Sequence, residues 1–221
     1  MRESQMSEVR RKKLAKGIFI SLEGIEGTGK TTQSRLLSEV LIEKGYEVVL
    51  THEPGGTAIG DRIREILLHV NHGAMSYMTE LLLYNAARAQ HISEKILPAI
   101  KAGKIVITDR FIDSTVAYQG YGRGIDIQLI KSINNIATEG VKPDLTIIFD
   151  LDVETGMKRN RGINKIDRLE LEDIEFHRKV RDGYLKIANE EPQRIKVIDA
   201  STSIEDVRAK VWEIISWRLG M

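Results

Sequence analysis

The stretch Gly24-Ile25-Glu26-Gly27-Thr28-Gly29-Lys30-Thr31 follows the apolar run Ile18-Phe19-Ile20-Ser21-Leu22 and precedes a helix-like segment rich in leucine. It has the pattern G-x-x-x-x-G-K-[ST] in the strand-to-helix setting that a phosphate-binding loop requires. Its glycines let the backbone turn tightly, so that several N–H groups point at phosphate oxygens, and the helix that follows adds its positive dipole end. A glycine-rich turn without a ligand is the alternative, which the flanking strand and helix patterns disfavour.

The side chains of this loop predict how a nucleotide binds. Lys30 can reach the β and γ phosphates, and the Thr31 hydroxyl can coordinate Mg²⁺. We therefore expect the nucleotide to be bound by Gly24, Ile25, Glu26, Gly27, Thr28, Gly29, Lys30, Thr31 and Thr32.

The composition limits what kind of protein this chain can be. With 221 residues and 42% hydrophobic content, the chain suffices for one domain with a sizeable core. Lys and Arg number 33 against 32 Asp and Glu, so no overall field attracts nucleic acid or an acidic membrane surface. The absence of cysteine excludes disulfides and thiolate metal sites. No apolar stretch approaches the roughly 18 residues of a membrane span, so we expect a cytoplasmic protein that binds neither nucleic acid nor membrane.

Residues 1–16 form a basic segment, with six Lys or Arg against two Glu and few apolar side chains. No apolar core of a secretory signal follows these charges. We expect a flexible, solvated tail, with a basic arm for an anionic partner as the alternative.

From Gly17 onward, strand-like and helix-like segments alternate. Short apolar runs predict strands at 18–22, 48–50, 104–108, 145–149 and 195–198. Helical periodicity predicts helices at 30–44, 59–68, 79–101, 114–118, 127–138 and 203–219. Pro98 should kink the third of these helices or split off its last turn. Because strands separated by helices require a parallel sheet, the sequence predicts a three-layer α/β fold of the P-loop NTPase type, with five parallel strands flanked by helices.

Polar residues follow three of the predicted strands, and ligands of parallel sheets bind at the carboxyl ends of the strands. The phosphate loop follows the first strand, Glu53-Pro54-Gly55-Gly56-Thr57 the second and Asp109-Arg110 the third. Asp109 is placed to hold Mg²⁺ through water, with capping of the helix that begins near Asp113 as the alternative. Arg110 would add a planar guanidinium that grips a phosphate with two hydrogen bonds.

Three strings of residues carry a resemblance to one known family. They are Glu53-Pro54-Gly55-Gly56-Thr57, the segment from Tyr84 through Arg88-Ala89-Gln90-His91, and Asp109-Arg110-Phe111 with Ser114, Ala117, Tyr118 and Gln119. Together they resemble the thymidylate kinases, from about Gly17 to the C-terminus. The resemblance implies ATP and Mg²⁺ as cofactors, dTMP as the acceptor, one nucleoside monophosphate kinase domain over residues 17–221, and a homodimer formed through helices on the sheet's flank.

The resemblance also implies which residues bind dTMP. In this family the arginine of the Asp-Arg pair, here Arg110, holds the acceptor phosphate and is supported by Arg64. The base stacks on Tyr84, where many relatives have Phe. Arg88 donates to a thymine carbonyl, and Gln119 helps read the base edge.

Two further roles concern the sugar. Tyr118 packs under it, where an aromatic ring disfavours a 2′-hydroxyl, and Glu26 points toward it. From the spacing alone, Tyr84 and Tyr118 could simply be core aromatics. The substrate-binding residues implied are Glu53, Pro54, Arg64, Tyr84, Arg88, Arg110, Ser114, Tyr118 and Gln119.

One branch of the family has an arginine at the position of Gly27, whereas the other supplies arginines from a flexible LID. This chain resembles the second branch, with Lys158-Arg159-Asn160-Arg161-Gly162 opening a LID at about 158–170. Such arginines neutralise charge on the transferring group; a solvated basic turn is the alternative. Ile163-Asn164-Lys165-Ile166 departs from the more basic LID of many relatives, which leaves Arg159, Arg161 and Arg168 as candidates. The catalytic residues implied are Lys30, Arg110, Arg159, Arg161 and Glu26.

The predicted function is therefore transfer of the γ-phosphoryl of ATP to dTMP, giving dTDP and ADP for dTTP synthesis. A kinase for another nucleotide or nucleoside would share nearly everything but the base contacts. A regulatory P-loop NTPase switch would use Lys30 and Asp109 equally well, but it has no need of Arg64, Tyr84 or Arg88.

Overall fold

The computed structural model describes residue 12, residues 14–160 and residues 167–221, and its centre is a parallel sheet. The strand order is β2-β3-β1-β4-β5. The strands are β1 (Ile18–Glu23), β2 (Val48–His52), β3 (Ile105–Asp109), β4 (Leu145–Asp150) and β5 (Ile195–Asp199). The five predicted strands are confirmed, with ends that differ by two residues at most.

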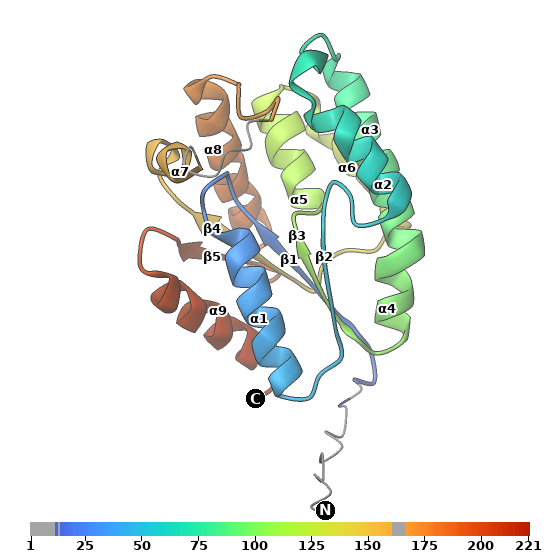
Figure 1. Cartoon of the computed structure of the whole chain (residues 1–221), viewed down its shortest axis with the longest axis vertical. Helices are drawn as coiled ribbons and strands as arrows, with labels where there is room; N and C mark the ends of the chain where they lie inside the picture. Colours follow the sequence, from blue (N-terminus) through green and yellow to red (C-terminus); the bar gives the residue numbers. More distant parts are fainter. Residues whose placement is uncertain (1–11, 13, 161–166) are drawn as a thin grey trace, which may run out of the picture.

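Helices cover both faces of this sheet, as the prediction of three layers requires (Figure 1). The α-helices are α1 (Lys30–Glu43), α2 (Ala58–Leu68), α3 (Tyr77–His91), α4 (Leu97–Lys101), α5 (Ile112–Thr115), α6 (Ile127–Thr138), α7 (Val153–Asn160), α8 (Ile174–Glu190) and α9 (Ile204–Arg218). A short 3₁₀ helix, η1 (Val70–His72), and two π-helical segments, η2 (Ile92–Ile96) and η3 (Val116–Gly122), complete the list. No helix among these described residues is long and apolar enough to cross a membrane.

The core divides into two layers because strand side chains alternate between the faces of the sheet. Ile20 and Ile107 pack with α1 and α9 on one face. Phe19 and Val106 pack with η2 and α4 on the other face, where α6, η3 and α8 continue the layer. Alternating strand residues are thus buried on both sides, which is why the strands read as continuous apolar runs.

Several helices begin at a polar residue whose side chain accepts a backbone N–H of the first turn. Such caps satisfy donors that a helix start would otherwise leave unpaired. The capping residues are Thr57 for α2, Ser76 for α3, Asp126 for α6, Asp173 for α8 and Ser203 for α9.

The predicted helix at 79–101 is divided where proline breaks the pattern. α3 is followed by η2 and then by α4, in which Pro98 occupies the first turn. Proline is tolerated there because its missing N–H has no partner in a first turn. The backbone stays helical from α3 through η2 into α4, so the hydrogen-bond pattern changes ahead of Pro98 while the last turn stays joined to the helix.

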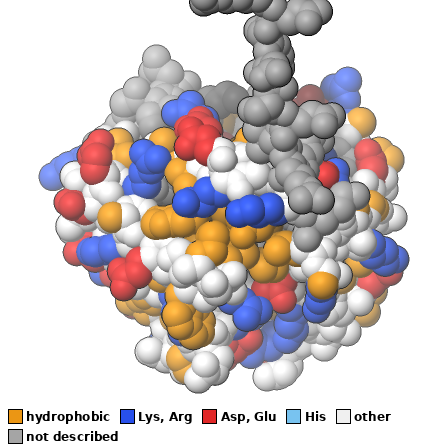
Figure 2. All heavy atoms as spheres, turned by 90° about the horizontal axis from the view of Figure 1, so that it is seen from below, with side chains coloured by type: hydrophobic (Ala, Val, Ile, Leu, Met, Phe, Trp, Pro, Cys, Tyr) orange, Lys and Arg blue, Asp and Glu red, His pale blue; other side chains and the backbone are white. Residues whose placement is uncertain are grey.

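The two ends of the described chain meet at Tyr46. Lys12 N donates to Gly45 O at 2.7 Å, and the Lys12 ammonium lies 5.4 Å from the centre of the Tyr46 ring. The Tyr46 hydroxyl donates to Met221 Sδ at 3.6 Å. Figure 2 shows this end of the molecule, where hydrophobic side chains gather beside Lys and Arg. Most of the tail expected at residues 1–16 lies outside the described residues, so its flexibility stays a prediction.

A buried ion pair ties the start of β5 to α5 and β4. Arg194 donates to both carboxylate oxygens of Asp113 at 2.8 Å, and Thr146 Oγ1 donates to the same carboxylate at 3.0 Å. The Asp113 side chain is 3% exposed and that of Arg194 13%. Little solvent is therefore available to replace a lost partner.

We expect Arg194→Met to lower the free energy of unfolding by about 3–5 kcal/mol, because it leaves the Asp113 charge buried and unpaired. Urea denaturation measures the change. The control is Arg62→Met, which breaks an exposed pair with Glu65 and should cost about 0.5 kcal/mol or less. Equal losses in the two variants would contradict the structural role of the buried pair.

Candidate active site

The phosphate loop joins β1 to α1 in the turn that the sequence predicts. Gly24, Gly27 and Gly29 have φ angles of 139°, 74° and 87°, left-handed values that favour glycine. A Cβ at Gly27 would lie 2.2 Å from the carbonyl oxygen of Gly156 in α7. No side chain fits there without a backbone shift, which explains why this chain has no arginine in the loop.

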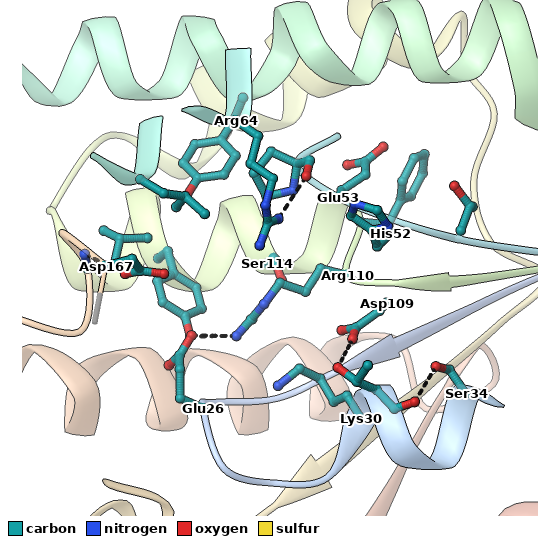
Figure 3. A pocket seen from close by; sticks show the side chains of 18 of the residues that line it. Glu26, Lys30, Ser34, His52, Glu53, Arg64, Asp109, Arg110, Ser114 and Asp167 are labelled. Carbon is teal, nitrogen blue, oxygen red and sulfur yellow. Dashed lines mark hydrogen bonds and ion pairs between the residues drawn. The ribbon is translucent and has the colours of Figure 1, made fainter. Parts of the chain in front are cut away.

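Lys30 is the first residue of α1, and its ammonium group points back into the loop (Figure 3). Nζ donates to the Ile25 carbonyl at 2.7 Å and to Thr28 Oγ1 at 3.2 Å. Burial and the nearby Arg110 lower the pKa of Lys30 to about 8, against the opposite effect of Asp109. Lys30 and Arg110 are two neighbouring cations with little water around them, an arrangement that favours binding of an anion between them.

Thr31 and Asp109 form the pair that the sequence predicts for a metal site. Thr31 Oγ1 donates to Asp109 Oδ2 at 2.5 Å, across the gap between α1 and the end of β3 (Figure 3). Asp109 does not cap the following helix: α5 begins after Phe111 and has no side-chain cap. The alternative role considered for Asp109 is therefore wrong.

This pair suits Mg²⁺ bound together with a nucleotide. Mg²⁺ usually takes one or two carboxylates, with the rest of its octahedron filled by water and substrate phosphates. Among the described residues there is no cluster of three or more His, Cys, Asp or Glu that could hold a metal alone. One carboxylate and one hydroxyl beside the phosphate loop are the donors that such a shared ion needs.

Arg110 lies opposite Lys30 and is surrounded by hydrogen-bond acceptors. Nη2 donates to Glu26 Oε1 at 2.6 Å, and Nη1 donates to the Gly24 carbonyl at 2.9 Å. Tyr118 donates to both oxygens of Glu26. Burial alone would raise the pKa of Glu26, but Arg110 and Lys30 outweigh it, so the pKa lies below its ordinary value. Arg110 is also one of two non-glycine residues with positive φ among the described residues, at 72°, a strained geometry that tertiary contacts must hold.

Glu23, to which sequence reasoning gave no role, anchors the segment around Arg110. Its buried carboxylate accepts the Phe111 N–H at 2.7 Å and the Ser114 hydroxyl at 2.6 Å. Tyr184 of α8 donates to it at 3.1 Å. Burial and the nearby Asp113 raise the pKa of Glu23. Its signal in the sequence is an acidic residue that ends an otherwise apolar strand.

Arg88 is held in place by four hydrogen bonds and is 1% exposed. It donates to Glu53 Oε2 at 2.8 Å, Thr115 Oγ1 at 2.8 Å, Asn134 Oδ1 at 2.8 Å and the Phe111 carbonyl at 3.0 Å. A guanidinium has five N–H donors. One Nη2 proton thus has no partner among the described residues and can donate to a ligand.

Glu53 supports Arg88 and faces away from free solvent. Its second oxygen, Oε1, lies 3.0 Å from His91 Nδ1, and His91 Nε2 lies 2.7 Å from Thr51 Oγ1. Both carboxylate oxygens therefore have protein partners, while Glu53 also lines the cavity. The ligand contact predicted for Glu53 stays a prediction. Neighbouring Pro54 accepts Arg64 Nη1 through its carbonyl at 2.8 Å, which aims the Arg64 guanidinium at the same cavity (Figure 3).

Two of the three LID candidates lie among the described residues, and their environments differ. Arg159 donates to the carbonyls of Ala200 at 2.9 Å and Ser201 at 3.4 Å, in the loop after β5. Arg161 lies outside the described residues. Arg168 is 5% exposed, with Nη2 2.6 Å from Glu80 Oε2. In this structure Arg168 also donates through Nε to the Leu67 carbonyl at 3.1 Å, and which LID arginine acts on a phosphate stays a prediction.

Most of the predicted site residues line one cavity of about 720 Å³, a size that suits nucleotide-sized ligands. Those that line it are Glu26, Gly27, Lys30, Thr31, Thr32, Glu53, Pro54, Arg64, Tyr84, Arg88, Asp109, Arg110, Ser114, Tyr118 and Gln119. Gly24, Ile25, Thr28, Gly29 and Arg159 do not line it in the described structure. Asn160, Asp167 and Glu170 add LID residues that sequence reasoning did not single out.

A phosphate loop between a parallel strand and its helix, beside a carboxylate from the neighbouring strand, defines a P-loop nucleotide-binding protein. A family model described as Thymidylate kinase matches residues 22–211. The chain belongs to the thymidylate kinase family.

Individual relatives agree over nearly the whole chain. The thymidylate kinase of Geotalea uraniireducens (strain Rf4) is 49% identical over 211 residues, which cover 92% of this chain and 98% of that protein. The thymidylate kinase of Pelobacter propionicus (strain DSM 2379 / NBRC 103807 / OttBd1) is 50% identical over 210 residues, which cover 92% of this chain and 96% of that protein. The crystal structure of thymidylate kinase from Ehrlichia chaffeensis matches with a TM-score of 0.75 and 40% identity, covering 90% of this chain and 99% of that one.

The pKa of Lys30 predicts how ATP affinity depends on pH. Below about pH 8 the free protein already carries the ammonium that phosphates require. Above it, binding must first restore that proton, so the Kd for ATP should rise by up to about tenfold per pH unit. Isothermal titration calorimetry from pH 7 to 9.5 measures the slope. Lys30→Met should bind ATP weakly without this rise, and an equal slope in both proteins would assign the titration elsewhere.

Proposed function

We propose that this protein transfers the γ-phosphoryl group of ATP to dTMP, giving dTDP and ADP, in the supply of dTTP. One observation carries the proposal: Lys30, Arg110 and the Tyr84–Arg88 face of α3 line the same cavity. Lys30 suits a nucleoside triphosphate, Arg110 suits an acceptor phosphate, and the Tyr84–Arg88 face suits a base. A switch protein has no use for the last two.

The chemistry needs position and charge more than a covalent nucleophile. Two phosphates must approach each other, so cancelling their repulsion and aligning them is most of the catalytic task. In the proposed reaction Lys30 and the loop N–H groups hold the donor phosphates, while Arg110 and Arg64 hold the acceptor phosphate. Arg159 and Arg161 are the LID arginines proposed to act on the transferring group, and their closure would exclude water.

Thr31 and Asp109 are the residues that would hold Mg²⁺. At these residues Mg²⁺ would supply positive charge that offsets the negative charge of the phosphates during transfer. The Thr31 hydroxyl already lies 2.5 Å from the Asp109 carboxylate. The two oxygen atoms that would bind the metal therefore lie close together beside the phosphate loop.

Base recognition would rest on Tyr84 and Arg88. The Tyr84 ring offers a stacking surface, and burial raises the pKa of its hydroxyl, as does Glu80, so the ring stays neutral. Arg88 has one N–H left for a thymine carbonyl. Tyr118 would pack under the sugar, and its hydroxyl is held by Glu26.

The first test is ADP release with Mg²⁺ and ATP across dTMP, dUMP, UMP, dCMP, dGMP and AMP, with a no-acceptor control. We expect strong stimulation by dTMP. In Tyr84→Ala/Arg88→Ala, the kcat/KM for dTMP should fall by about 10² or more, because stacking and a buried hydrogen bond are both lost, whereas the Kd for ATP should stay within about twofold. Equal slow release in every reaction would favour the switch protein, and a different preferred acceptor would favour another nucleotide kinase.

We also propose that the protein is a cytoplasmic homodimer. α3 packs between α2 and α6, and this flank exposes apolar side chains. Ile66 of α2 is 45% exposed, Leu82 of α3 is 51% exposed and Ile136 of α6 is 77% exposed. Exposed apolar side chains on three neighbouring helices are typical of an interface between subunits.

Leu82→Glu should abolish the dimer, because two carboxylates would be buried against each other at the centre of this face. Light scattering coupled to size exclusion should then give half the wild-type mass. Val197→Glu is the matched control, since Val197 on edge strand β5 is 45% exposed and lies away from this flank. A wild-type protein that is already monomeric at micromolar concentration would refute the homodimer.

A further inference from the structure

Glu80 is a fully buried acid that lies next to the proposed base site and has no role so far. It stands on α3 one turn before Tyr84 and two turns before Arg88, so the three share a face of the helix. Its exposed fraction is 0%. Buried carboxylates are rare unless they are paired, so its partners indicate what it does.

Glu80 accepts hydrogen bonds from two side chains of the chain's second half, Gln119 and Arg123, and forms an ion pair with a third, Arg168. Its Oε2 lies 2.6 Å from Arg168 Nη2 and 3.2 Å from Arg123 Nη2. Its Oε1 accepts Gln119 Nε2 at 2.7 Å and Arg123 Nε at 3.3 Å. Burial alone would raise the pKa of Glu80, but Arg123, Gln119 and Arg168 outweigh it and lower the pKa. Glu80 is therefore an ionised acceptor.

An ionised carboxylate fixes the orientation of the Gln119 amide. A carboxylate can only accept hydrogen bonds, so Gln119 must turn its NH₂ group toward Glu80. The oxygen of the Gln119 amide then points away from Glu80. That oxygen accepts no hydrogen bond from the described residues, and Gln119 lines the cavity with Tyr84 and Arg88.

We propose that Glu80 is a positioning residue for base specificity, which holds the Gln119 carbonyl as an acceptor for a pyrimidine N3–H. The inference rests on the proposed function. Thymine and uracil carry a hydrogen on N3, whereas the N3 of cytosine is itself an acceptor. Two facing acceptors repel each other and leave both buried groups unpaired. The Glu80–Gln119 pair thus rejects cytosine nucleotides independently of Arg88.

The substitution Glu80→Gln should reverse the amide. Arg168 Nη2 and Arg123 Nη2 both face Oε2 and can only donate, so the new glutamine presents its single oxygen there and gives up the longer 3.3 Å contact with Arg123 Nε. Its NH₂ group then takes the place of Oε1 and donates to Gln119, which turns its own NH₂ toward the cavity. A donor in that position repels the thymine N3–H and accepts the N3 of cytosine.

The experiment compares the kcat/KM for dTMP, dCMP and dUMP in wild type and Glu80→Gln. The ratio of dTMP to dCMP should fall at least about tenfold, without inversion, because Arg88 still favours a carbonyl over an amino group. The ratio of dTMP to dUMP should stay within about threefold, since both bases carry N3–H. A folded Glu80→Gln protein with an unchanged ratio of dTMP to dCMP would overturn the proposal.

Arg123→Met is the matched control. It removes an ion pair of Glu80 and destabilises the same region, yet it leaves the carboxylate beside Gln119. Thermal unfolding should show a loss comparable to that of Glu80→Gln, with the ratio of dTMP to dCMP unchanged. If Arg123→Met lowers that ratio as much as Glu80→Gln does, the effect is structural and the proposal fails.

A measurement on the wild-type protein does not depend on the stability of any variant. The Gln119 side-chain NH₂ group, assigned in ¹⁵N spectra by its absence in Gln119→Glu, should exchange with solvent at least about 100-fold more slowly than exposed glutamines. Exchange at the exposed rate would overturn the proposal. If wild type does not phosphorylate dTMP at all, the proposed function fails, whereas this exchange result still reports on the Glu80–Gln119 bond.

Discussion

The parallel pairing of β1 with β3 is the constraint on which the site depends. Its register sets Leu22 beside Asp109, so the phosphate loop and the Asp109-Arg110 segment leave the sheet at the same level. The backbone confirms the closeness: Arg110 N donates to the Leu22 carbonyl at 2.9 Å. Thr31 can then meet Asp109, and Arg110 can face Lys30, without any long loop to position them. Because both strands are buried on both faces, a slip in this register would also disturb the core.

Acidic side chains hold the arginines that face the cavity. Partly exposed Glu26 bonds Arg110 at 2.6 Å, and buried Glu53 bonds Arg88 at 2.8 Å. Away from the cavity, Glu80 contacts Arg168 at 2.6 Å. A buried guanidinium without a partner would be strongly destabilising, so Arg88, which is 1% exposed, requires the acid behind it. The pairing also fixes the orientation of the guanidinium, because an N–H that donates to an acid holds the group in one position. Arg88 therefore presents a single defined donor where a solvated arginine would present five.

The sequence was sufficient for the parts of this structure that local chemistry determines. Apolar runs located the strands, and the glycine pattern located the phosphate loop with Lys30 and Thr31. It was not sufficient for contacts between distant segments. Glu80 reads as an ordinary acid in the first turn of a helix, and only the fold shows that Gln119 and Arg123 lie against it. The contact between Glu53 and His91 could not be predicted for the same reason, since the two residues lie on different elements.

The internal bonds of Lys30 and Arg110 define what nucleotide binding must replace. Lys30 bonds two groups of its own loop, and Arg110 bonds Glu26 and the Gly24 carbonyl. A phosphate oxygen carries more charge than a carbonyl, so exchanging the Ile25 carbonyl for it is favourable for Lys30. Arg110 differs, because its partner Glu26 is already an anion. A phosphate at Arg110 therefore gains most if Glu26 keeps the hydrogen bonds from the Tyr118 hydroxyl and yields the N–H of Arg110 Nη2. The Glu26–Arg110 bond thus sets how strongly an acceptor must be charged to bind.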